Sequence, residues 1–242
     1  MKSPSDEDLR TLIINVESRK DRQLEMEKRF KKLNLSFEFI KAIEPSDLVA
    51  TSQKLLSQTA ECVWLSHIKC LHISSKRNHP TLIVEDDATF LLKSHELTAL
   101  ANQMSENGID FIQIGYLNLN LAEGIAIRIR NLYNFFTKKN LAPRFLKLFG
   151  FKEVERSASQ GWRRNLPNNF VVNDVRYGAH CYLVSPNFAK SMLELNSPAF
   201  LAADDFYVAL SRMKTFRMVR LAKSLSGQDG SPSSFSQRYL AE

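Results

Sequence analysis

Short apolar runs alternate with longer segments of helical periodicity along the first half of this chain. The apolar runs are Thr11–Val16, Phe37–Ile43, Thr81–Val84 and Asp110–Tyr116. Their length and composition are typical of buried strands. Apolar residues recur at helical spacing in the intervening segments Asp21–Leu33, Ala60–Ser74 and about Ser94–Met104. This order predicts an α/β fold in which a mostly parallel sheet has helices on both faces.

The second half of the chain is less regular but fits the same domain. Strand character returns in Val171–Val184, and helices are expected at Pro186–Leu195 and Asp204–Met213. Proline is well tolerated in the first turn of a helix, which supports the first of these two helices. A length of 242 residues suits one large α/β domain. We therefore predict a single domain over residues 1–242, with a basic, aromatic insert at residues 124–170.

The positive charge of the chain is concentrated in that insert. The chain carries a formal net charge of +7, and the segment Gly124–Lys152 holds seven Lys and Arg residues without one acidic residue. The rest of the sequence is therefore neutral. Such a segment attracts phosphates, nucleic acid or an anionic membrane surface, and its interleaved phenylalanines suit the boundary of a bilayer. The alternatives are a solvated surface helix or a lid that packs its aromatic residues on the protein.

The remaining composition gives an expectation about location. No apolar run approaches the roughly 18 residues that span a bilayer, and the polar start MKSPSDEDLR does not have the apolar segment of a signal peptide. We therefore expect a cytoplasmic protein, with attachment to the inner face of the cytoplasmic membrane through residues 124–152 as one alternative.

Three consecutive acidic residues follow the third predicted strand. In open α/β sheets, ligands bind at the carboxyl ends of the strands, where Glu85, Asp86 and Asp87 are expected to lie. Glu85 and Asp87 are two residues apart, so in extended backbone they would project to the same side. Oxygen ligands of this kind suit Mg²⁺ or Mn²⁺. The alternative is that Asp86 or Asp87 caps a turn.

Three other groups of residues are candidates for binding or catalysis. Arg19 and Arg22 follow the first strand and its Asn15, where arginines can bind phosphate, although by themselves they more often mark the solvated start of a helix. Ser18 or Asp21 is expected to cap the helix that begins there. Ser66-His67 lies on a helix whose apolar face more often buries a structural histidine. Asp204-Asp205 begins a late helix, where a carboxylate can act as a general base or merely cap the helix.

Taken in order, these segments resemble glycosyltransferase family 25, bacterial enzymes of lipopolysaccharide and lipooligosaccharide core synthesis. The family pattern Ile-Asn-Leu-x-Arg-Arg-x-x-Arg matches Ile14 to Arg22, with Val16 and Ser18 as departures. Its Ser-His and Leu-Glu-Asp-Asp motifs correspond to Ser66-His67 and Val84–Asp87. Further matches are Asp110–Gly115, Gly178, Tyr182–Ser185, Ala189, Asp204-Asp205 and Gln228. The resemblance covers nearly the whole chain except the basic insert.

The resemblance implies a GT-A fold, a UDP-sugar donor such as UDP-galactose, and transfer with inversion to a lipid-linked oligosaccharide acceptor. It implies a divalent metal, Mn²⁺ or Mg²⁺, held by Glu85, Asp86 and Asp87, and a catalytic base at Asp205, with Asp204 as the alternate. The donor-binding residues that it implies are Asn15, Arg19, Arg22, Ser66, His67, Asp86, Gly178 and Gln228.

Two other classes stay open at the level of sequence. A metal-dependent nuclease or phosphotransferase could use the same acidic cluster, with the basic segment binding nucleic acid; little else in the chain supports nucleic acid. A non-catalytic protein could keep the fold without turnover, although both acidic clusters are present.

Overall fold

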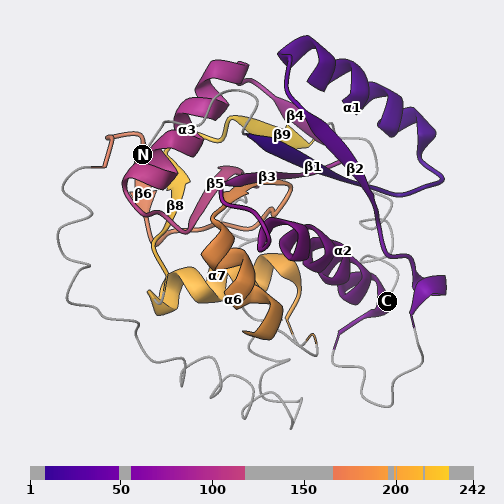
Figure 1. The fold of residues 1–242 in the computed structure, drawn as a ribbon. Coiled ribbons are helices and arrows are strands. Elements are labelled where there is room, and N and C mark those ends of the chain that lie inside the picture. The colour runs from indigo at the N-terminus through magenta and orange to yellow at the C-terminus, as the bar shows by residue number, and fades with distance from the viewer. Residues whose placement is uncertain are drawn as a thin grey trace, which may run out of the picture.

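A computed structural model describes residues 9–48, 56–117, 166–195, 199, 201–214 and 216–228 (Figure 1). The basic segment at residues 124–152 lies outside the described residues, as does most of the predicted insert. The strands are β1 (Arg10–Asn15), β2 (Phe37–Lys41), β3 (Thr81–Glu85), β4 (Ala88–Phe90), β5 (Phe111–Gly115), β6 (Phe170–Val172), β7 (Cys181–Val184), β8 (Met218–Leu221) and β9 (Ser226–Gln228). The helices are α1 (Lys20–Leu33), α2 (Gln58–Ser74), α3 (Ser94–Glu106), α6 (Pro186–Leu195) and α7 (Ala203–Met213), with a short 3₁₀ turn at Pro45–Asp47.

The strands form one sheet in the order β2-β1-β3-β7-β5-β8-β6, and β9 joins β4 to β5 beside this path. β1 pairs in parallel with β2 and β3, and β5 pairs in parallel with β8. β7 lies between β3 and β5 and is antiparallel to both. The predicted α/β, Rossmann-like fold is confirmed. The antiparallel β7 was not expected, because strand direction depends on connections that periodicity does not report.

Helices cover both faces of this sheet, as Figure 1 shows. Alternate residues of β1 enter different cores: Leu12 and Ile14 pack with residues of α2, α6 and α7, whereas Ile13 packs with residues of α1 and α3. Successive side chains of a strand point to opposite faces, so one apolar run supplies both cores. The near-continuous apolar composition of β1 is therefore the consequence of burial on both sides.

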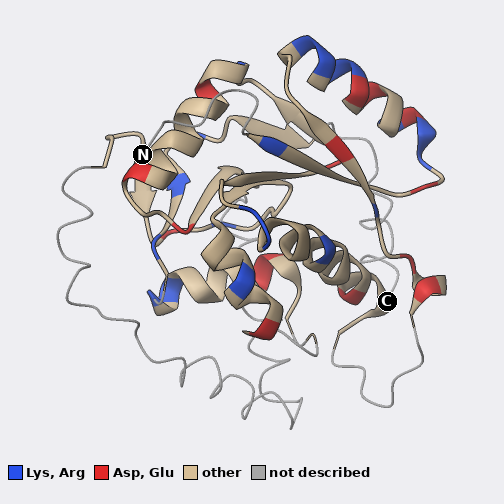
Figure 2. Cartoon of the chain, viewed as in Figure 1, with Lys and Arg blue, Asp and Glu red and all other residues tan. Residues whose placement is uncertain are grey.

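Helix α1 presents one buried stripe to the sheet. Arg22, Met26 and Phe30 are spaced four residues apart and are all buried, as expected for one face of a helix. The opposite side carries both basic and acidic side chains (Figure 2). The predicted cap was wrong: Arg19 occupies the N-cap position without a side-chain hydrogen bond, because a guanidinium has no acceptor for the N–H groups of the first turn. Within the described residues, no helix is both long and apolar enough to cross a bilayer.

Candidate active site

A cavity of about 300 Å³ opens at the carboxyl ends of β1 and β3 and at the start of α7. This is the edge at which open α/β sheets bind ligands. Its lining includes five carboxylates, those of Glu85, Asp86, Asp87, Asp204 and Asp205. Among the described lining residues, Arg22 is the one with a permanent positive charge. The structure thus brings the two acidic clusters, 119 residues of sequence apart at Glu85 and Asp204, to one cavity.

Asp86 is held by residues of the β1–α1 connection. Its Oδ2 accepts hydrogen bonds from Asn15 Nδ2 at 2.8 Å and from the Val16 backbone N–H at 3.3 Å. Its Oδ1 accepts a hydrogen bond from Arg22 Nη1 at 2.9 Å. Burial raises the pKa of Asp86, although Arg22, Asn15 and Val16 oppose the rise. Both carboxylate oxygens are therefore engaged within the protein, and Asn15 acts on the site by orienting Asp86.

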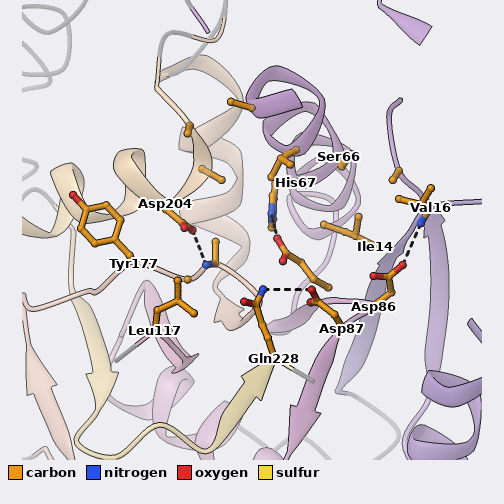
Figure 3. Close-up of a pocket in the computed structure, with 18 of the residues that line it drawn as sticks. Ile14, Val16, Ser66, His67, Asp86, Asp87, Leu117, Tyr177, Asp204 and Gln228 are labelled. Carbon is orange, nitrogen blue, oxygen red and sulfur yellow. Dashed lines mark hydrogen bonds and ion pairs between the residues drawn. The ribbon is translucent and has the colours of Figure 1, made fainter. Parts of the chain in front are cut away.

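Asp87 and Glu85 contact different side chains. β3 ends at Glu85, and Asp86 and Asp87 form the turn into β4. The expectation that Glu85 and Asp87 share one side of an extended strand is therefore wrong. Figure 3 shows Asp87 directed toward Gln228, whose Nε2 lies 3.5 Å from Asp87 Oδ2. Arg22 Nη1 lies 3.7 Å from the same oxygen.

Glu85 and His67 form a pair on the wall of the cavity. His67 Nε2 lies 3.2 Å from Glu85 Oε1, and His67 Nδ1 lies 2.7 Å from the Tyr182 hydroxyl, which lies 3.2 Å from the Tyr207 hydroxyl. Burial raises the pKa of Glu85, but the hydrogen bond with His67 and the electrostatic attraction of His67, His180 and Arg22 together hold this pKa below its ordinary value. His67 is thus a fully buried residue that orients the carboxylate of Glu85. Its burial fits the prediction of a structural histidine, and its position at the cavity fits the resemblance.

Asp204 begins α7 and also faces the cavity (Figure 3). Its Oδ1 accepts a hydrogen bond from the Ala179 backbone N–H at 2.6 Å. Burial, together with the negative charge of Glu85, raises the pKa of Asp204 to about 6, although backbone hydrogen bonds from Gly178 and Ala179 oppose the rise. A carboxylate with this pKa is ionised at neutral pH and is more basic than an ordinary aspartate, which suits a general base.

The wall beside Asp204 is a segment that side chains hold in place. The buried amide of Gln113 on β5 donates to the backbone oxygens of Arg176 and Gly178 at 2.7 and 2.9 Å and accepts from the Arg176 N–H at 2.8 Å. Ser211 of α7 accepts from the Val175 N–H at 3.1 Å. This segment forms no strand, and the side chains of Gln113 and Ser211 help to fix its position.

Two predicted donor-binding residues have local roles in the described structure. Arg19 pairs with Asp21 at 2.8 Å on the exposed start of α1 and does not belong to the described cavity lining. Ser66 lines the cavity, but its hydroxyl donates to the Cys62 backbone oxygen at 2.7 Å and accepts from the Ile43 N–H at 2.8 Å. Arg22, His67, Gly178 and Gln228 line the cavity.

The described residues contain no group of three or more His, Cys, Asp or Glu side chains arranged to hold a metal ion. Both carboxylate oxygens of Asp86 accept hydrogen bonds within the protein, from Asn15, Val16 and Arg22. A metal held by all three carboxylates is therefore not supported by this arrangement. A site that shares its ligands with a bound diphosphate needs fewer carboxylates, since Mg²⁺ binds through one or two carboxylates and substrate phosphates.

The sequence model of glycosyltransferase family 25 (LPS biosynthesis protein) matches residues 8–207. The chain belongs to glycosyltransferase family 25. This membership confirms the resemblance and assigns the chain glycosyl transfer in lipopolysaccharide biosynthesis. The matched range contains the β1–α1 connection, the acidic turn and the start of α7, so every described lining residue of this glycosyltransferase cavity except Gln228 lies within the family match. A search of curated proteins found no match.

Three of the residues that sequence reasoning missed shape this glycosyltransferase cavity and its wall. Leu117 and Tyr177 line the cavity, and Gln113 supports its wall. Leu117 directly follows the predicted strand Asp110–Tyr116, and Tyr177 directly precedes Gly178, so proximity to a predicted motif was the available signal. Gln113 was the polar residue in an apolar strand, and a buried amide of this kind requires hydrogen-bond partners.

Proposed function

We propose that this glycosyltransferase transfers a hexose, with galactose as the first candidate, from a UDP-sugar to a lipid-linked core oligosaccharide with inversion. The observation that supports it is the convergence of Arg22, Asp87, Gln228 and the Asp204-Asp205 pair on one cavity at the carboxyl edge of the sheet. The donor would occupy the end near Arg22 and Val16, with His67 beside it. The nuclease alternative relied on the basic segment outside the described residues, and the family match favours glycosyl transfer.

The charge balance of the cavity supports a divalent cation as cofactor. Five carboxylates and one arginine line it, and a diphosphate would be repelled unless a cation offset that charge. Asp87, with Glu85 as a second candidate, has the hard oxygen donors that Mn²⁺ or Mg²⁺ prefers, whereas both oxygens of Asp86 are occupied. When bound, such an ion would stabilise negative charge on the leaving diphosphate.

A single displacement needs a base beside the acceptor hydroxyl. In this proposal a carboxylate at the start of α7 takes the hydroxyl proton, the acceptor oxygen forms a bond to the anomeric carbon, and the bond from that carbon to the β-phosphate oxygen breaks. UDP leaves with the electron pair. Asp205 is the base implied by the resemblance, but the contacts favour Asp204, because the Ala179 N–H fixes its carboxylate at the cavity and its pKa is raised to about 6.

The test is a donor screen with the purified full-length chain. UDP-galactose, UDP-glucose and UDP-N-acetylglucosamine are each incubated with Mn²⁺, Mg²⁺ or EDTA, and released UDP is measured with and without core oligosaccharide from mild acid hydrolysis of lipopolysaccharide. We expect metal-dependent UDP release that the oligosaccharide accelerates, most with UDP-galactose. Full activity in saturating EDTA would contradict the cofactor, and turnover of none of the UDP-sugars would contradict the donor class.

A further inference from the structure

The two ends of the cavity differ in chemistry. Figure 3 shows Val16 and Asp86 at one end and Tyr177, Leu117 and Asp204 at the other. The first end contains the arginine and the acidic turn, whereas the second combines apolar side chains with a carboxylate. A pocket that joins an apolar surface to a few polar groups is the usual form of a site for an organic ligand.

The backbone fixes Leu117 and Tyr177 next to each other. The Leu117 N–H donates to the Tyr177 backbone oxygen at 2.7 Å. Gly178 follows with φ at +105°, and a Cβ at this glycine would lie 2.9 Å from Leu117 N. Only a glycine accepts both this backbone conformation and this close approach. The Leu117 and Tyr177 side chains are therefore held next to each other where these two backbone segments cross.

Both residues line the cavity. Leu117 is 36% exposed, and Tyr177 is a partly buried residue that packs on the core around α7. The faces of aromatic rings carry partial negative charge, and the C–H groups of a pyranose ring carry partial positive charge. An aromatic ring beside an exposed leucine thus suits the C–H face of a sugar.

The position of Asp204 indicates whether this surface binds the donor sugar or the acceptor sugar. The Ala179 N–H that binds Asp204 lies two residues after Tyr177, so the carboxylate and the aromatic side chain belong to the same wall. A base must lie at the hydroxyl that it deprotonates, which belongs to the acceptor. We propose that Tyr177 and Leu117 form the subsite for the terminal pyranose of the acceptor, an inference that rests on the proposed transferase function.

The experiment compares Tyr177→Ala, Tyr177→Phe and Leu117→Ala with the wild type. Leu24→Ala is the matched control, because Leu24 is a 53% exposed leucine on α1 that does not line the cavity. Saturation-transfer NMR measures binding of core oligosaccharide from mild acid hydrolysis of lipopolysaccharide, and initial rates with UDP-galactose give KM for each substrate. Thermal unfolding checks that each variant is folded.

We expect Tyr177→Ala to weaken oligosaccharide binding about tenfold and to raise acceptor KM more than KM for UDP-galactose. Leu117→Ala should also weaken oligosaccharide binding, and it provides the test if Tyr177→Ala does not fold. Tyr177→Phe, which keeps the aromatic ring, should retain binding, and Leu24→Ala should match the wild type. Undiminished oligosaccharide binding in folded Tyr177→Ala and Leu117→Ala would overturn the subsite. Tyr177-dependent binding without turnover of UDP-sugars would support the subsite and contradict the transferase proposal instead.

Discussion

At the scale of single residues, the first question is which carboxylate at the start of α7 is the base. Asp204→Asn can still accept the Ala179 N–H bond but cannot take a proton, so we expect turnover to fall about 10²–10⁴-fold with little change in donor affinity. Asp205→Asn, which makes the same chemical change at the neighbouring position, should cost far less. Initial rates and UDP-galactose binding would measure both variants, and the reverse pattern would identify Asp205 as the base.

The raised pKa of Asp204, about 6, gives the sign of two pH effects. Below this value Asp204 is protonated and cannot act as a base, so kcat/KM should fall about tenfold per pH unit on the acid side. Because folding raises this pKa, the folded state loses stability as pH rises from the ordinary aspartate value through 6. Asp204→Asn should therefore raise the urea midpoint at pH 7.5 more than at pH 4. An unchanged acid limb in residual Asp204→Asn activity would point to another group.

A substitution at Asp87 tests the proposed metal cofactor. Asp87→Asn keeps the shape of the side chain and its contact with Gln228 but removes the charge that a cation would need. We expect transfer to be lost while thermal unfolding of the metal-free protein changes little, because repulsion among neighbouring carboxylates is relieved. Activity assays and Mn²⁺ titration followed by thermal shift would check this. Wild-type rates in the variant would contradict the role of Asp87.

At the scale of elements, Gln113 connects β5 to the wall of the cavity. Gln113→Leu leaves the Arg176 N–H and the backbone oxygens of Arg176 and Gly178 without this partner, and a buried polar group left unpaired costs about 1–3 kcal/mol. We expect at least about 2 kcal/mol of destabilisation and a lower kcat. Gln23→Leu on α1, which packs on the other face of the sheet, is the control. Urea unfolding would measure the loss, and equal effects of both substitutions would contradict a specific clamp.

The elements that could be predicted from sequence are those whose pattern of apolar residues lies entirely within the element itself. Met26 and Phe30 mark the buried face of α1 by spacing alone, and the apolar run in β3 needs no partner to be recognised. β4 was missed because Asp86-Asp87 reads as the polar end of a strand, whereas the return of the chain depends on pairing with β9, which lies about 140 residues later. Long-range pairing of this kind has no local pattern.

The candidate site shows the same division. Glu85 and Asp204 could be predicted because acidic residues at strand and helix ends are conspicuous, but their approach to one cavity depends on the tertiary fold. Which of Asp204 and Asp205 is fixed by the Ala179 N–H depends on the phase of α7 against that segment. Tyr177 and Gln113 act through contacts with residues 60 or more positions away in sequence, such as the bonds between Gln113 and Arg176, so no spacing rule identifies them.

At the scale of the whole molecule, the uneven charge predicts where the enzyme works. The basic segment Gly124–Lys152 lies outside the described residues, and its seven positive charges account for the net charge of the chain. The proposed lipid-linked acceptor would be presented at a membrane, and each basic residue near an anionic surface contributes about 1 kcal/mol. We therefore predict reversible attachment to anionic membranes at the inner face of the cytoplasmic membrane.

Co-sedimentation with vesicles of phosphatidylglycerol or of phosphatidylcholine, at 0.05 and 0.5 M salt, measures this attachment. The protein should bind the anionic vesicles and be partly released by salt, because screening weakens charge interactions at a surface. Lys138→Gln/Lys139→Gln removes two charges from the basic segment and should weaken binding by about 2 kcal/mol, or roughly thirtyfold. Lys31→Gln/Lys32→Gln makes the same change on the exposed part of α1 and should have a much smaller effect. Equal binding of both double variants would show that net charge, and not the basic segment, attaches the enzyme. Negligible binding to both vesicle types would contradict membrane attachment, and the segment would then act as a lid or bind the acceptor.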